Sequence, residues 1–162
     1  MAAPQPDDLS APLRLDRYLP YLINRAGVSL ATRFSAALRA AGIALQDWRV
    51  LAALRERDGQ RLTELAQRTS IEVSTLSRLV GGLEANGLVS RNRDSDDARA
   101  IAIRLTAAGE RVTATLTPAA QQLEAAAVAG LTQDEIVQLK SLLDRIYGNL
   151  AELPATEDTP AT

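Results

Sequence analysis

The sequence predicts an α+β fold that is mainly helical, and three observations support this fold class. Hydrophobic residues make up 46% of the 162 residues but aromatic residues only 3%, so most apolar side chains are those of Ala, Leu, Val and Ile, which pack readily between helices. Most of these residues recur at steps of three and four, the period of an amphipathic helix. Two short stretches within residues 88–105 alternate instead, which indicates one β-hairpin.

The N-terminal part of the chain predicts two helices. Pro20 suits the first turn of a helix, and Leu22 and Phe34 belong to an apolar face that continues until Gly42 provides a C-terminal stop. A second helix, DWRVLAALRER, covers residues 47–57 and ends at the Asp-Gly pair that follows. Because this second helix is short and carries Trp and Leu on one face, we expect it to be buried.

The central part of the chain predicts a helix-turn-helix. Thr63 is expected to cap a helix over ELAQR. After a break at residues 69–71, a further helix covers VSTLSRLVGGLEAN and is ended by Gly87. Two short helices joined by a break of this length form a helix-turn-helix. In the second of them, the side chains expected to face inward are Val73, Leu76, Leu79 and Val80.

A β-hairpin and two more helices complete the predicted order. LVSRNRD and RAIAIRL alternate on either side of the polar loop SDDA, so a hairpin is expected directly after the helix-turn-helix. A helical pattern then runs from about residue 106 to 130. Thr132 and Glu135 form a T-x-x-E capping box at the start of the last helix.

The last helix has the apolar spacing of a coiled-coil seam. Its apolar residues follow one another at alternating steps of three and four from Ile136 to Leu153. A seam of this kind needs a partner helix, which predicts a homodimer. The residues expected in its interface are Leu22 of the first helix and Leu139, Leu143, Ile146 and Leu150 of the last.

The composition excludes several classes of protein. With neither Cys nor His in the chain, a disulfide framework, a zinc enzyme, a Cys protease and a Ser-His-Asp hydrolase are excluded. We expect no metal and no cofactor, because the acidic run Asp94, Asp96 and Asp97 lacks the Gly and the distal Glu of an EF-hand loop. No apolar run approaches 18 residues and no secretory signal is recognised, so we expect a cytoplasmic protein without membrane contact.

The order of these elements resembles the MarR family of transcriptional regulators over roughly residues 17–153. The matching stretches are LPYLINRAG, QDWRVLAAL, LTELAQRTSIEVSTLSRLVGGLEANGLVSR and RDSDDARAIAIRLTAAGE. The resemblance implies a winged helix-turn-helix lobe over residues 43–108 that binds double-stranded DNA. It also implies a dimerisation domain formed by the N- and C-terminal helices, at 13–42 and 109–153. The aperiodic stretches 1–12 and 154–162 are rich in Pro, Ala and acidic residues and are expected to be disordered tails.

DNA contacts are expected from the second helix of the helix-turn-helix and from the hairpin wing. Hydroxyls and a guanidinium at the start of that helix can reach phosphates and base edges, and Arg91 and Arg93 share one face of a strand and would present two cations together. By resemblance, Arg99 enters the minor groove and Asp97 holds it, although Ala98 replaces an Arg that is frequent in the family. The predicted DNA-binding residues are Arg61, Ser74, Thr75, Ser77, Arg78, Arg91, Arg93, Asp97 and Arg99.

Three positions at or within the same helix, one acidic and two flexible, leave alternatives open. Glu72 would repel phosphate unless its carboxylate turns away or accepts a hydrogen bond from cytosine. Gly81 and Gly82 cost about 1 kcal/mol each relative to Ala inside a helix. They either allow close approach of another helix or of the DNA backbone, or they are tolerated weak points.

An effector pocket is expected in the first two helices, which bound a cleft in the family. An aromatic wall beside a guanidinium would suit an aromatic carboxylate. The alternative is that the rings belong to the core and that the Arg side chains only extend over it. The candidate residues are Tyr18, Tyr21, Arg25, Trp48 and Arg49.

The function expected from these features is a repressor that leaves a palindromic operator when a small effector binds. The formal charge of −2 is unusual for a nucleic-acid binder, but nine Arg residues lie within residues 55–104 against eight acidic residues. The near-neutral charge also permits a winged-helix module that binds protein instead of DNA. A helical-bundle enzyme is not expected, because the sequence has no nucleophile with an adjacent base and no phosphate-binding loop.

Overall fold

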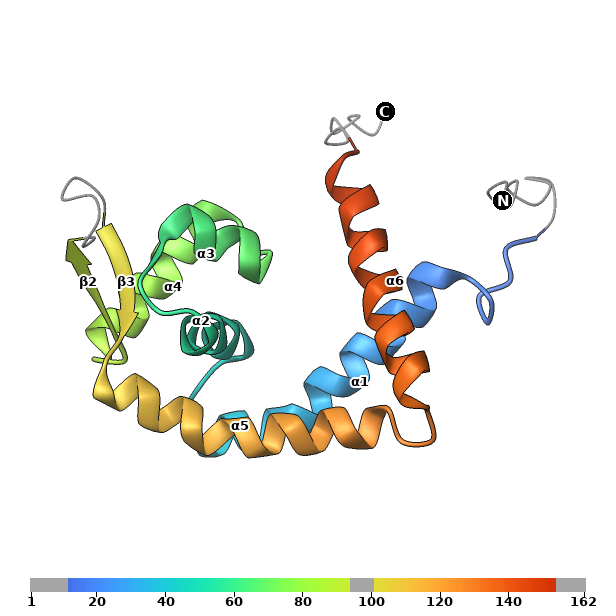
Figure 1. Cartoon of the computed structure of the whole chain (residues 1–162), viewed down its shortest axis with the longest axis horizontal. Coiled ribbons are helices and arrows are strands. Elements are labelled where there is room, and N and C mark those ends of the chain that lie inside the picture. The colour runs from blue at the N-terminus through green and yellow to red at the C-terminus, as the bar shows by residue number, and fades with distance from the viewer. Residues whose placement is uncertain (1–11, 94–100, 154–162) are drawn as a thin grey trace, which may run out of the picture. The chain divides into compact units, whose positions relative to one another are not determined.

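The computed structural model describes residues 12–93 and 101–153 and confirms the predicted fold class (Figure 1). The chain forms two compact units, one up to Leu123 and one from Glu124 onward. In chain order, the helices and strands are α1 (Leu19–Ala40), α2 (Leu45–Glu56), β1 (Gln60–Arg61), α3 (Leu62–Thr69), α4 (Val73–Ala85), β2 (Val89–Arg93), β3 (Ile101–Leu105), α5 (Ala107–Ala127) and α6 (Gln133–Ala151).

The strands form an antiparallel sheet in the order β1-β3-β2. The expected hairpin is confirmed, with Val89 opposite Leu105 and Arg93 opposite Ile101. Strand β1 was not predicted. It consists of two residues, and Gln60 lies opposite Ile103, a pairing that no alternating pattern in so short a segment can indicate.

The main core lies where α2, α3 and α4 meet the sheet (Figure 1). Leu51, Leu54, Leu65 and Leu76 have no exposed surface, and Ile103 of β3 closes the cluster with 1% exposure. Full burial of a Leu side chain contributes about 1.5 to 3 kcal/mol. This core holds the helix-turn-helix against the hairpin, so the two elements expected to carry the site are fixed relative to each other.

A second cluster attaches α1 and α5 to α2. Phe34 and Leu38 of α1 pack with Leu116 of α5, and Trp48 of α2 lies partly buried against them. The Phe34 and Trp48 rings are 5.5 Å apart with an interplanar angle of 66°, a favourable edge-to-face geometry.

No single helix in the described ranges is long and apolar enough to cross a membrane, although α1 and α2, bent by 83°, together meet that requirement of length and composition.

The predicted helix ends are confirmed at several points and wrong at one. Gly42 and Gly87 both have a φ of 68°, the left-handed conformation that ends helices. Thr63 does not cap α3. The helix begins one residue earlier, at Leu62, and the Glu64 carboxylate accepts a hydrogen bond from the Arg61 backbone N–H at 2.8 Å. A Glu at the third helical position therefore satisfies the N–H of the N-cap residue Arg61, and Thr63 lies inside the helix.

The capping box of α6 is confirmed. The Thr132 N–H donates to the Glu135 carboxylate at 2.7 Å, and the Glu135 N–H donates to the Thr132 hydroxyl at 3.3 Å. The pKa of Glu135 is lowered below its usual value, first by the hydrogen bond from the Thr132 backbone N–H and then by the Thr132 hydroxyl, which donates to the same carboxylate at 2.9 Å. The cap fixes where α6 begins and therefore sets the register of its apolar side chains.

Candidate nucleic-acid interface and ligand pocket

Helix α4 begins with a capping arrangement that the sequence did not indicate. Glu72 is the N-cap residue, and its carboxylate accepts hydrogen bonds from the Thr75 backbone N–H at 3.0 Å and from the Ser74 hydroxyl. The hydrogen bond from the Ser74 hydroxyl is the largest cause that lowers the pKa of Glu72 to about 2. Glu is not among the preferred N-cap residues, so no local signal predicted this role.

This cap settles which way the Glu72 carboxylate turns. The carboxylate points back to the first turn of α4, where it is occupied by Ser74 and Thr75. The Ser74 hydroxyl donates its proton to Glu72 and therefore cannot donate the same proton to a phosphate while this contact persists. The cap thus links an acidic side chain to one of the hydroxyls that were expected to contact DNA.

The outer face of α4 carries three of the predicted site residues. Ser74, Ser77 and Arg78 are exposed, and Thr75 is half-buried. The inward face is confirmed for Leu76 and Val80, which have no exposed surface, and for the half-buried Leu79. The prediction was wrong for Val73, whose relative exposure is 43%. At the first position of α4, Val73 lies beyond the reach of the core that covers the later positions.

Arg78 extends along the surface of its own helix. Its Nε donates to the Ser74 carbonyl and its Nη2 to the Thr75 hydroxyl, both at 3.4 Å. These distances are long for N–H···O hydrogen bonds, so the contacts orient the guanidinium without holding it firmly. The side chain can exchange them for the stronger bidentate contact that an Arg makes with guanine.

Arg91 is tied to α4 through Glu84. Its guanidinium lies 2.6 Å from the Glu84 carboxylate, its backbone N–H donates to the same carboxylate at 3.2 Å, and its Nη2 donates to the Ser77 carbonyl at 3.4 Å. The two cations expected to act together on one strand face are therefore not equivalent. Arg91 is paired and joins β2 to α4, whereas Arg93, at the end of β2, is exposed.

Of the remaining predicted DNA-binding residues, Arg61 lies within the described residues and two lie outside them. Arg61 is exposed and lies where β1 passes into α3. Asp97 and Arg99 lie outside the described residues.

Gly81 and Gly82 lie on α4, and a Cβ built on either would meet no atom within 4 Å among the residues considered. The described chain therefore provides no helix that approaches these glycines closely.

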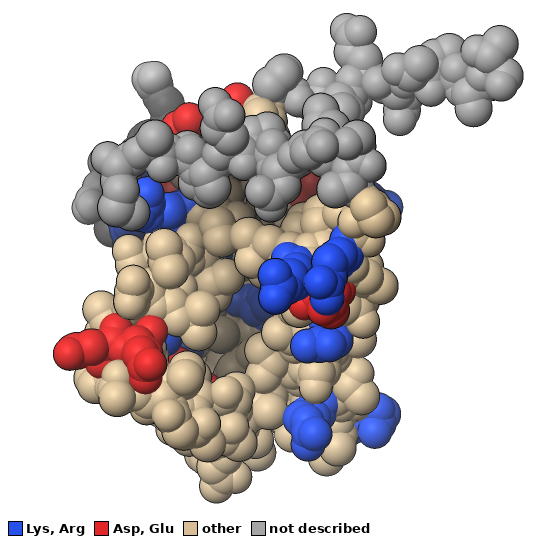
Figure 2. Space-filling model, turned by 90° about the vertical axis from the view of Figure 1, so that its right-hand side faces the viewer, with Lys and Arg blue, Asp and Glu red and all other residues tan. Residues whose placement is uncertain are grey.

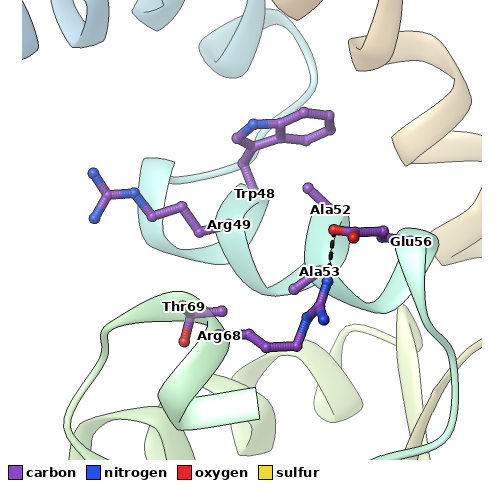
Figure 3. A pocket seen from close by; sticks show the side chains of 7 residues that line it. All are labelled: Trp48, Arg49, Ala52, Ala53, Glu56, Arg68 and Thr69. Atoms are coloured by element: carbon purple, nitrogen blue, oxygen red, sulfur yellow. Dashed lines mark ion pairs between the residues drawn. The ribbon is translucent and has the colours of Figure 1, made fainter. Parts of the chain in front are cut away.

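A surface pocket lies between α2 and α3 and contains two of the five predicted effector residues (Figure 3). It is lined by Trp48, Arg49, Ala52, Ala53, Glu56, Arg68 and Thr69. Arg68 pairs with Glu56 at 2.7 Å, whereas the Arg49 side chain points away from this pair in Figure 3. Within the described residues, Arg49 has no hydrogen bond or ion pair. The pocket thus combines an indole surface with a guanidinium available to an anion.

The other three predicted effector residues do not line this pocket. Tyr21 and Arg25 of α1 contact each other, with the Arg25 guanidinium 5.6 Å from the centre of the Tyr21 ring, a cation–π distance. Tyr18 precedes α1 and is exposed. Trp48 partly supports the alternative interpretation, since it also packs on Phe34 in the second core cluster.

The predicted dimer residues lie on exposed apolar surface. Helix α6 has no buried residue, and Leu139, Leu143 and Leu150 are exposed while Ile146 and Leu22 are half-buried. Charged side chains form only small separate groups on the face of the molecule drawn in Figure 2. Within the described residues, nothing buries the seam of α6.

Comparison with known proteins identifies relatives over most of the chain. A sequence model of the MarR family matches residues 43–101. The chain is 30% identical to the HTH-type transcriptional regulator FarR of Neisseria gonorrhoeae over 83% of this chain and 87% of that protein. It is similar to the crystal structure of a MarR family transcriptional regulator from Silicibacter pomeroyi, with 31% identity, a TM-score of 0.73 and coverage of 89% and 95%. It is also similar to NadR in complex with 4-hydroxyphenylacetate, with 27% identity, a TM-score of 0.73 and coverage of 89% and 100%.

Proposed function

Since this chain belongs to the MarR family of transcriptional regulators, we propose that it is a cytoplasmic, homodimeric repressor. It binds a palindromic operator and releases it when a small effector binds. The observation that carries this proposal is the exposed face of α4, where Ser77 and Arg78 lie next to a wing that Arg91 fastens to the same helix. Repression follows because a protein seated on the operator excludes the polymerase.

Base recognition is assigned to α4. Contacts to the DNA backbone and the minor groove are assigned to residues that flank α4 and to the wing. Arg78 is the candidate for a bidentate contact to guanine, a contact that discriminates between bases by about 1 to 3 kcal/mol. Ser74, Thr75 and Ser77 supply polar contacts near the helix N-terminus. Arg61, Arg93 and, by resemblance, the Asp97 and Arg99 pair supply contacts to phosphates and the minor groove.

The dimer is assigned to the apolar seam of α6 with Leu22 of α1. Leu143 and Leu150 keep 42% and 61% of their surface exposed, and a second copy would remove this apolar surface from water. Two copies related by a twofold axis place their recognition helices about one DNA turn, roughly 34 Å, apart. A palindromic operator is the matching target because each copy then reads one half-site.

A small aromatic acid is the proposed effector. The pocket beside Trp48 offers an aromatic surface and the Arg49 guanidinium, which has no partner within the described residues. Tyr21 and Arg25 form a second aromatic and cationic pair on α1. The similar NadR structure contains 4-hydroxyphenylacetate, a ligand of the same class. An acid of this kind releases DNA only if it binds more tightly to the arrangement that does not fit the operator.

The DNA-binding proposal is tested by measuring affinity over a range of salt concentrations. The full-length protein is used to select a duplex from a random library, and binding to it is compared with binding to a scrambled duplex. Wild-type affinity should fall steeply with salt. Arg78→Ala should cost about 1 to 3 kcal/mol on the selected duplex and little on the scrambled one.

Arg33→Ala, at an exposed position on α1, serves as the matched control and should bind both duplexes like the wild type. If Arg78→Ala loses the same affinity on both duplexes, base recognition by Arg78 is wrong. Failure to select any duplex would contradict DNA binding itself.

The effector is tested with a panel of benzoates, hydroxycinnamates and pyridine carboxylates. At least one should raise the Kd for the selected duplex, and Arg49→Ala or Arg25→Ala should reduce that response while binding without the acid stays nearly unchanged. Arg55→Ala, an exposed Arg on α2 that does not line the pocket, should respond like the wild type. If every compound leaves both affinity and melting temperature unchanged, the proposed effector class is wrong.

A further inference from the structure

Val73 is an exposed apolar residue at the start of the recognition helix. It occupies the first position of α4 and has a relative exposure of 43%, although the helical period groups it with the buried Leu76 and Val80. Its position four residues before Ser77 places both side chains on one exposed stripe. An apolar side chain thus lies within the surface that is proposed to enter the major groove.

The local fold does not require a valine at this position. Glu72 caps the helix through Ser74 and Thr75 and makes no use of the Val73 side chain. β-Branched residues lower helix propensity relative to Ala. Exposure also forfeits much of the stabilisation that a buried valine provides. Relative to alanine, a valine here therefore lowers helix propensity, and its exposed surface gains no stabilisation from burial within the described chain.

We propose that Val73 is a specificity-determining residue that packs against the C5-methyl group of a thymine in each half-site, an inference that rests on the proposed function. The thymine methyl is the one apolar group that a base pair displays in the major groove, and apolar side chains recognise it by contact. In a helix the valine side chain is nearly fixed in one χ1 rotamer. It therefore loses little conformational freedom when it meets the base.

Val73 and Arg78 recognise different base pairs. The two residues are five positions apart, which is about 7.5 Å along a helix axis. Ser74 and Ser77 lie between them in the sequence and supply polar contacts. Glu72 takes no part in base recognition, because its carboxylate is occupied by the cap. The first two turns of α4 therefore combine one apolar contact to thymine with one bidentate contact to guanine in each half-site.

The experiment replaces single thymines of the selected duplex with deoxyuridine, which removes only the methyl group. For the wild-type protein, the deoxyuridine substitution should weaken binding at one thymine position, which recurs by symmetry in both half-sites. The loss should be about fourfold for each half-site, the value expected from burial of one methyl-sized group. Val73→Ala should bind the unmodified duplex about as weakly as the wild type binds the substituted one. The same deoxyuridine substitution should then leave the affinity of Val73→Ala unchanged.

Two controls separate this inference from its premise. Val28→Ala removes an exposed valine from α1, where the relative exposure is 57%, and should respond to deoxyuridine like the wild type. If no thymine position affects the wild type, or if the effect persists fully in Val73→Ala, the role of Val73 is overturned while DNA binding stands. If no duplex is selected at all, the proposed function fails and the inference fails with it.

Discussion

The core of the helix-turn-helix and the seam of α6 are built from the same kind of residue and differ in what covers them. In the core, Leu54 and Leu76 have no exposed surface, whereas on α6 Leu143 and Leu150 remain 42% and 61% exposed. Both sets follow the three- and four-residue period of an amphipathic helix. The period therefore identifies the apolar face of a helix, but it does not tell whether the covering surface belongs to the same chain.

The difference has an energetic consequence. Each fully buried leucine stabilises the lobe by about 1.5 to 3 kcal/mol, and this contribution is independent of protein concentration. The seam of α6 provides a comparable contribution only when a second copy covers it, so its stabilisation depends on concentration. Two predictions test this contrast directly, and two further predictions concern polar contacts of α4.

The largest effect is expected from the seam. Changing Leu143→Asp together with Ile146→Asp should abolish the dimer, because two unpaired carboxylates from each copy would have to be buried in the interface. The lobe around Leu54 should keep its fold. Sedimentation velocity at micromolar concentration measures assembly, and circular dichroism measures the fold. Val137→Asp, at an exposed position outside the seam, should remain dimeric. A wild-type monomer under these conditions would contradict the assignment of the seam.

The next effect concerns the core. Leu76→Ala should lower the free energy of unfolding by about 2 to 5 kcal/mol, through lost burial and the cavity left behind. Urea unfolding at two protein concentrations should give the same loss at both, since the cavity lies within one chain. Leu13→Ala, at a position 71% exposed, should change stability by less than about 0.5 kcal/mol. A loss for Leu76→Ala that depends on concentration would show that the core is not independent of the dimer.

A smaller effect is expected from the Glu84 and Arg91 pair. The two side chains are 37% and 33% exposed, so solvent screening limits the interaction to about 0 to 1 kcal/mol. A double-mutant cycle with Glu84→Gln and Arg91→Gln should give a coupling energy in this range that decreases as salt is added. The matched cycle with Arg93→Gln should show no coupling. Equal coupling in both cycles would contradict the specific link between the wing and α4.

The smallest effect is expected from the Glu72 cap and depends on pH. The pKa of Glu72 is lowered from 4.5 to about 2, so its ionised form stabilises the folded chain above pH 4.5. This stabilisation is lost as the pH falls from 4.5 to about 2. Relative to Glu72→Gln, the wild-type melting temperature should therefore decline over this interval. Glu110→Gln, at an exposed carboxylate without a hydrogen bond within the described residues, should follow the wild-type curve. Parallel curves for the wild type and Glu72→Gln would contradict the cap.

The features predicted correctly from the sequence are those that a local sequence pattern indicates. The Thr132 and Glu135 capping box and the glycine stops at Gly42 and Gly87 were expected, and each is present. The hairpin was also predicted, because its alternation and polar loop lie within one short segment. In each case the residue types that produce the feature are themselves visible in the local sequence, as a capping box, a glycine stop or an alternating pattern around a polar loop.

The features that only the tertiary structure decided depend on distant segments. Strand β1 exists because Gln60 meets Ile103, and Arg91 became a link because Glu84 of the preceding helix lies beside it. Val73 has the periodicity of a core residue and is nevertheless exposed. Periodicity counts positions along one helix, whereas burial and ion pairing require another segment to reach that position. The same sequence pattern therefore produced a buried core at Leu76 and an uncovered apolar side chain three residues earlier.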